Sequence, residues 1–133
     1  MTPPAWVFDT GAVMAYAEGV SRVGGIVVDA SDTDNTVGIP LVCLIEAYSR
    51  LGYENHDLVR VLRTSRTIQV LVPNSDAGHA DDCPVIGDMA RRGGRLGAGH
   101  ACLAALTSAA AVVTTRPDQI SAVLGPDWPV IEV

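Results

Sequence analysis

The order of short and long apolar segments is the feature that most constrains how this chain can fold. Short runs rich in β-branched residues are separated by longer segments in which apolar residues recur at helical spacing. This alternation predicts strands and helices in turn, and therefore a parallel sheet with helices on both faces. We expect an α/β fold, a three-layer α/β/α sandwich around a central parallel sheet of four or five strands. The expected strands cover residues 6–8, 37–39, 67–72, 109–113 and 130–133.

The expected helices lie between these strands. One starts after Asp9 and ends near Gly19, and an apolar stretch at 23–28 then meets an acidic, turn-forming segment at 29–36. The glycine-rich passage 93–99 is expected to connect two helices. Further helices are expected over residues 42–49, 58–62, 83–92, 100–108 and 118–124.

Length and composition favour one compact domain over residues 1–133. A chain of this size with 48% hydrophobic residues buries about two-thirds of its unfolded surface, so it needs neither a disulfide nor a structural metal. Its three cysteines, Cys43, Cys83 and Cys102, have no CxxC spacing, which favours a reduced, cytoplasmic protein. No apolar segment reaches the roughly 18 residues of a membrane span, and we expect neither secretion nor membrane association.

The charge balance excludes a basic nucleic-acid coat protein. The net charge is −6, and all nine basic residues are arginines, which can bind phosphates or carboxylates in a bidentate manner. Arg91, Arg92 and Arg95 form the dense basic cluster, next to glycines. Two roles stay open for them: contacts with the phosphates of RNA, or favourable placement at the end of a helix.

Two acidic residues stand out by their position. Asp9 follows the first expected strand and precedes a helix, so it can cap that helix or project into the crevice where parallel sheets bind ligands. Glu46 lies on a helix among apolar neighbours, where a carboxylate needs a partner such as a metal ion, an arginine or water.

Three motifs resemble those of the PIN-domain family, the fold of the VapC-type toxin ribonucleases of bacterial toxin–antitoxin pairs. They are WVFDTGAVMAYAEG around Asp9, IPLVCLIEAYSRL around Glu46, and GHACLAALTSAAAVVTTRPDQI towards the C-terminus. Active members of that family gather three or four acids around Mg²⁺ or Mn²⁺ and hydrolyse RNA phosphodiesters, because hard cations prefer oxygen ligands and activate water. The resemblance implies that Asp9 and Glu46 are catalytic and metal-ligating residues.

The chain departs from the family pattern at two of the expected acids, where Ala98 and Arg116 stand. Arg116 can pair with Asp9 or Glu46 in the place of a metal, or it can bind a phosphate. Asp118 is a candidate third metal ligand, and Asp88 and His100 are further candidates to compensate for the missing acids. Their alternative roles are ordinary ones: Asp118 as a helix cap and His100 as a helix-start or surface histidine.

Two functions from different classes therefore compete. The first is a divalent-metal endoribonuclease, impaired by the missing acids. The second is a non-catalytic PIN-fold module that binds RNA, an antitoxin-like partner or a second copy of itself as a homodimer. A receiver or flavodoxin-like domain is disfavoured because Asp9 has no acidic neighbour and neither GxGxxG nor GxxxxGK[ST] occurs.

Overall fold

The computed structural model describes residues 2–133 and contains a single five-stranded sheet in that range. The strands are β1 (Trp6–Phe8), β2 (Val37–Pro40), β3 (Ile68–Leu71), β4 (Ala111–Thr114) and β5 (Val130–Glu132). They are all parallel, in the order β3-β2-β1-β4-β5. The predicted α/β fold with a parallel sheet is confirmed.

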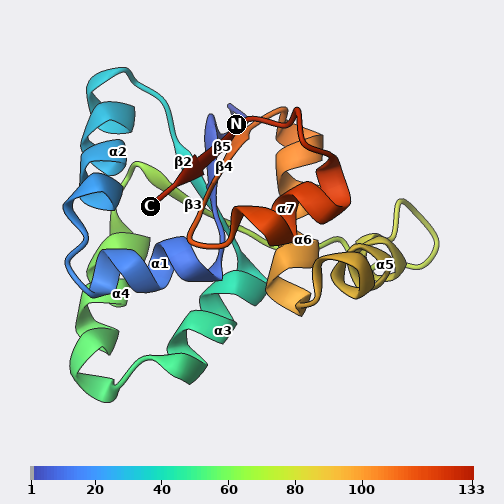
Figure 1. Cartoon of the computed structure of the whole chain (residues 1–133), viewed down its shortest axis with the longest axis horizontal. Coiled ribbons are helices and arrows are strands. Elements are labelled where there is room, and N and C mark those ends of the chain that lie inside the picture. The colour runs from blue at the N-terminus through green and yellow to red at the C-terminus, as the bar shows by residue number, and fades with distance from the viewer. Residues whose placement is uncertain (1) are drawn as a thin grey trace.

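Helices cover both faces of this sheet (Figure 1). In the first half of the chain they are α1 (Thr10–Ala17), α2 (Ser21–Asp32), α3 (Leu41–Arg50), the short 3₁₀ helix η1 (Tyr53–Asn55) and α4 (His56–Thr64). In the second half they are α5 (Asp82–Gly93), α6 (Leu96–Ser108) and α7 (Pro117–Leu124). No helix within residues 2–133 is long and apolar enough to cross a membrane.

Alternation along the strands divides the buried side chains into two cores. Phe8 and Val113 face one side, where they pack with α1, α2 and α4, while Val7 and Val112 face the other side and pack with α5, α6 and α7. All four side chains are fully buried. Helix α3 contacts both α1 and α6, so it joins the two helix layers.

The strand order places a crevice next to the end of β1. From β1 the chain builds the sheet outward through β2 and β3, and then returns to add β4 and β5 on the other side of β1. Trp6 is accordingly paired with Val37 on one side and with Ala111 on the other. Loops at such a reversal diverge at the carboxyl ends of the strands, which is where open α/β sheets bind ligands.

Most predicted boundaries differ from the structure by one or two residues, and two differ by more. Helix α2 runs on to Asp32, through part of the segment expected to turn, because Ala30 continues the buried side that Val23 begins. Thr33 ends the helix, and its Oγ1 donates to the carbonyl of Asp29 at 2.8 Å. Helix α6 starts at Leu96, inside the glycine-rich passage. Its first turn is closed by a hydrogen bond to Glu46, which is described with the functional site.

Candidate functional site

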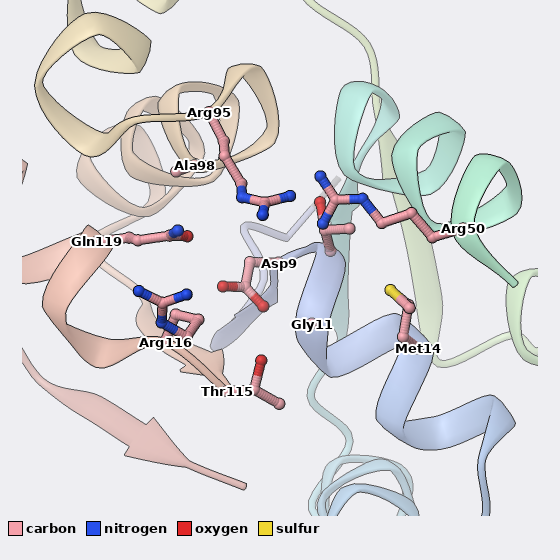
Figure 2. Close-up of a pocket in the computed structure, with 10 residues that line it drawn as sticks. Asp9, Gly11, Met14, Arg50, Arg95, Ala98, Thr115, Arg116 and Gln119 are labelled. Carbon is pink, nitrogen blue, oxygen red and sulfur yellow. The ribbon is translucent and has the colours of Figure 1, made fainter.

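A cavity of about 110 Å³ lies at the crevice, where four segments of the chain meet. It is bounded by the start of α1, the end of α3, the start of α6 and the turn between β4 and α7 (Figure 2). The residues that line it are Asp9, Thr10, Gly11, Met14, Arg50, Arg95, Ala98, Thr115, Arg116 and Gln119.

Asp9 both caps helix α1 and lines the cavity, so its two expected roles are compatible. Its Oδ1 accepts a hydrogen bond from the Ala12 N–H at 3.0 Å, and the residue is only 5% exposed. Burial raises the pKa of Asp9 to about 6, against hydrogen bonds from Thr114 and from the α1 backbone that lower it; the nearby Glu46 adds to the rise. Asp9 is therefore a carboxylate with a raised proton affinity at the wall of the cavity.

Glu46 is held in place by hydrogen bonds from two other helices. Its Oε1 accepts from the Thr10 hydroxyl at 2.9 Å and from the Gly97 N–H at 3.0 Å. Arg95, the residue that precedes α6, makes no side-chain cap of its own, so Glu46 supplies the missing acceptor for the first turn of α6. A Cβ at Gly97 would clash with Oε1 of Glu46 and with the Thr10 hydroxyl. This bond explains why α6 begins within the glycine-rich passage.

Ala98 and Arg116, the two departures from the family pattern, both line the cavity. Ala98 contributes only a methyl group. The interpretation that Arg116 pairs with Asp9 or Glu46 was wrong: its Nε and Nη2 donate to Oδ1 and Oδ2 of Asp118 at 3.2 and 3.0 Å. Asp118 is preferred because it lies two residues further along the same turn, and the pairing lowers the pKa of this exposed carboxyl.

The acids and the histidine considered as replacements lie elsewhere. Asp118 itself does not line the cavity, and Asp88 forms an exposed ion pair with Arg92 at 3.2 Å. His100 is buried on α6, where its Nδ1 accepts from the Val42 N–H at 3.3 Å, and it lines a different cavity. Burial lowers the pKa of His100 to about 4, so its ring is neutral near pH 7.

Three arginines from different segments line the cavity: Arg50, Arg95 and Arg116. Arg91 and Arg92 are exposed and do not line it, so the predicted basic cluster contributes only Arg95. Arg50 was not among the residues predicted from the sequence. A signal was present, since Arg50 follows Glu46 by four residues and so shares its helix face; their side chains lie 3.5 Å apart.

This set of residues does not fit a divalent cation in the manner that the family resemblance implies. Within residues 2–133, no three His, Cys, Asp or Glu side chains are grouped to hold a metal ion. Asp9 is the one carboxylate among the residues that line the cavity, and Oε1 of Glu46 already accepts two hydrogen bonds. Arg50, Arg95 and Arg116 line the same cavity; Glu46 and Asp118 pair with two of them, and Arg95 adds a further positive charge that opposes a cation.

Comparisons with known proteins support the fold. No family model and no curated protein matches the sequence. Among solved structures, a chain of the "2.2 A resolution structure of VapBC-1 from nontypeable Haemophilus influenzae" matches with a TM-score of 0.57 and 16% sequence identity. The match covers 96% of this chain and 96% of that chain. The two chains therefore share their architecture over nearly their whole length.

Proposed function

We propose that this chain is a PIN-like protein that binds RNA through phosphate groups and does not hydrolyse it with divalent metal ions. One observation carries the proposal: the cavity is lined by three arginines and one carboxylate. The likeness to the VapBC-1 chain supports the PIN-like part of the proposal through the shared fold.

Electrostatics disfavours a metal ion in this cavity. A guanidinium 4 Å from a unit charge contributes about 4 kcal/mol at an effective dielectric constant near 20, and this repulsion doubles to roughly 8 kcal/mol for a divalent cation. Asp9 and Glu46 supply attraction, but Glu46 is shared with Arg50 and with two hydrogen-bond donors.

The same groups suit an oxyanion. Arg95 has no carboxylate of residues 2–133 within salt-bridge distance, so its guanidinium is available to a ligand. Figure 2 shows the ends of Arg95 and Arg50 near each other and Arg116 on the other side of Asp9; Arg50 is shared with Glu46 and Arg116 with Asp118. Guanidinium groups bind phosphate through paired, charge-assisted hydrogen bonds. Thr115 and Gln119 add a hydroxyl and an amide to the lining.

RNA binding is tested by fluorescence anisotropy with a labelled single-stranded RNA over a range of salt concentrations. We expect binding that weakens with salt, with a slope of about −0.7 in log K against log salt for each phosphate contacted. Arg95→Met should reduce that slope by about 0.7. Arg63→Met, which removes an exposed arginine of α4 outside the cavity, is the matched control.

Hydrolysis is tested on the same RNA with Mg²⁺ or Mn²⁺ in the millimolar range. We expect no cleavage above the level without protein. Cleavage that needs the metal and disappears in Asp9→Asn would contradict the proposal and restore the nuclease hypothesis.

An antitoxin-like protein partner is a second candidate, favoured by exposed apolar side chains on neighbouring elements. Ile45 on α3, Tyr53 on η1 and Val61 on α4 are 58%, 89% and 58% exposed. Light scattering of the purified protein tests the homodimer, and co-expression with the product of a neighbouring gene tests the antitoxin-like partner.

A further inference from the structure

A second cavity, of about 140 Å³, lies beside the edge strand β3 and shares no lining residue with the first. We call it the edge cavity. It is bounded by the end of β3, the start of α5 and the second half of α6. Its apolar walls are formed by Leu71, Val72, Leu103 and Ala104.

His100 contributes a hydrogen-bond donor to the edge cavity. Its Nδ1 accepts the Val42 N–H at 3.3 Å, so Nδ1 carries no proton and the neutral ring holds its proton on Nε2. The residue is only 3% exposed, and burial lowers its pKa to about 4, which keeps the ring neutral near pH 7. The buried ring therefore has one N–H to donate.

This N–H has no partner within residues 2–133, where the only hydrogen bond of the His100 ring is the one at Nδ1. In the same range, no fully enclosed side-chain nitrogen or oxygen lacks a hydrogen-bond partner. Nε2 is therefore not fully enclosed, and it opens into the cavity that His100 lines. A donor in this place requires an acceptor from a ligand or from water.

Asp82 provides an acceptor on another wall of the edge cavity. Its Oδ2 accepts the Asn74 N–H at 2.8 Å, and no arginine or histidine of residues 2–133 lies within salt-bridge distance of it. A carboxylate has about four acceptor positions, so Asp82 can accept further bonds. Its negative charge acts on the His100 ring, where it opposes the larger effect of burial on the pKa.

The two groups together select the charge of a ligand. An anion would accept from Nε2 of His100 but would be repelled by Asp82, and a cation would be attracted to Asp82 but would leave the His100 N–H unpaired. A neutral amide has a carbonyl acceptor and an N–H donor, so it satisfies both groups. Thr107 and Ser108 also line the cavity, and their hydroxyls can donate or accept, so they do not change this preference.

From these observations we propose that the edge cavity binds a small neutral carboxamide with an apolar substituent. His100 Nε2 donates to the amide oxygen, Asp82 accepts from the amide N–H, and the substituent packs against Leu103 and Ala104. This site is independent of the proposed RNA function, because the two cavities have no residue in common.

The test compares three probes with the same branched alkyl chain: 3-methylbutanamide, 3-methylbutanoate and 3-methylbutylamine. Each is titrated into the ¹⁵N-labelled protein near pH 7 and followed by NMR. We expect the amide to shift the signals of Leu103, Ala104 and His100 Nε2 with a Kd of about 1–10 mM, as is usual for a ligand of this size. It should bind at least about fivefold more tightly than the acid or the amine, because each of these loses one hydrogen bond.

Variants locate the binding. Thr107→Leu places a larger side chain in the edge cavity and should abolish amide binding. Thr64→Leu is the matched control, because the hydroxyl of Thr64 on α4 also donates to the carbonyl four residues earlier, at 3.0 Å, as that of Thr107 does at 2.8 Å. Asp82→Asn removes the negative charge, so it should weaken binding of the amide and narrow the gap between the amide and the acid.

Each of four results would overturn the inference. Equal binding of the three probes would show that the alkyl chain alone is recognised. Tightest binding of the acid or the amine would refute the selection of a neutral group. Amide binding unchanged in both Thr107→Leu and Asp82→Asn would place the site elsewhere. Unchanged NMR signals at amide concentrations that saturate a millimolar site would show that the edge cavity binds no such ligand.

Discussion

Removal of the Glu46 side chain should destabilise the fold, because the carboxylate closes the first turn of α6. In Glu46→Ala, the Gly97 N–H and the Thr10 hydroxyl lose their shared acceptor, to which they donate at 3.0 and 2.9 Å. Hydrogen bonds to charged groups contribute about 1.5–3 kcal/mol each, and water reaches this partly exposed side chain, so we expect a total loss of about 2–4 kcal/mol. For a chain of this size, Tm should fall by roughly 6–12 °C.

Thermal and urea unfolding measure this loss, with two control variants. Glu46→Gln keeps an acceptor oxygen at the same place, so it should lose less than about 1 kcal/mol. Glu54→Ala removes an exposed carboxylate and should change stability by less than about 0.5 kcal/mol. If Glu46→Ala is as stable as Glu54→Ala, the structural role of Glu46 in closing α6 is refuted.

Three further predictions concern the same region. The pKa of Asp9 is about 6 in the folded chain, above the ordinary 3.8, so the folded state holds this proton more tightly; the unfolding free energy should fall by about 3 kcal/mol as pH rises from about 3 to about 7. Urea titrations at several pH values give the unfolding free energies of the wild type and of Asp9→Asn. The wild-type value minus the variant value should fall by this amount as pH rises, and a difference that does not change with pH would contradict the prediction. Gly97→Ala should lose about 1–3 kcal/mol through its clash with Glu46, whereas Gly25→Ala, in an open part of α2, should gain about 0.5–1 kcal/mol. Equal melting temperatures for these two alanine variants would refute the close approach at Gly97. Millimolar Mn²⁺ should leave Tm unchanged, while millimolar inorganic phosphate should raise it. If Mn²⁺ raises Tm and Asp9→Asn abolishes that rise, the conclusion that the cavity does not fit a divalent metal ion is refuted.

The sheet could be predicted from the sequence because each strand is short, rich in β-branched residues and bounded by turn residues. Ile68 and Val70 in β3 and the valines of β4 show this pattern clearly. The end of α2 could not be predicted in the same way, because acidic residues occur both in turns and on the exposed side of a helix. In the folded chain α2 continues past residue 29 because Ala30 is buried on its inner side.

The site was predicted less completely, and the reason lies in how its residues are brought together. Asp9 was found because it directly follows a strand, where the fold class alone gives its location. The direction of Arg116 could not be predicted, because it depends on a choice between a nearby partner, Asp118, and more distant carboxylates. Arg50 and Arg95 reach the cavity only through the packing of α3 against α6, which the sequence pattern does not specify.

The bonds of Glu46 affect how an acidic residue at this position should be interpreted in other sequences. Because this carboxylate links the starts of α1 and α6, it joins helices that cover opposite faces of the sheet. Selection for a folded protein is then enough to retain it, whether or not the chain has metal-dependent chemistry. A glutamate at this place in the fold therefore reports on assembly of the two helix layers, and its presence alone is not evidence of a catalytic centre.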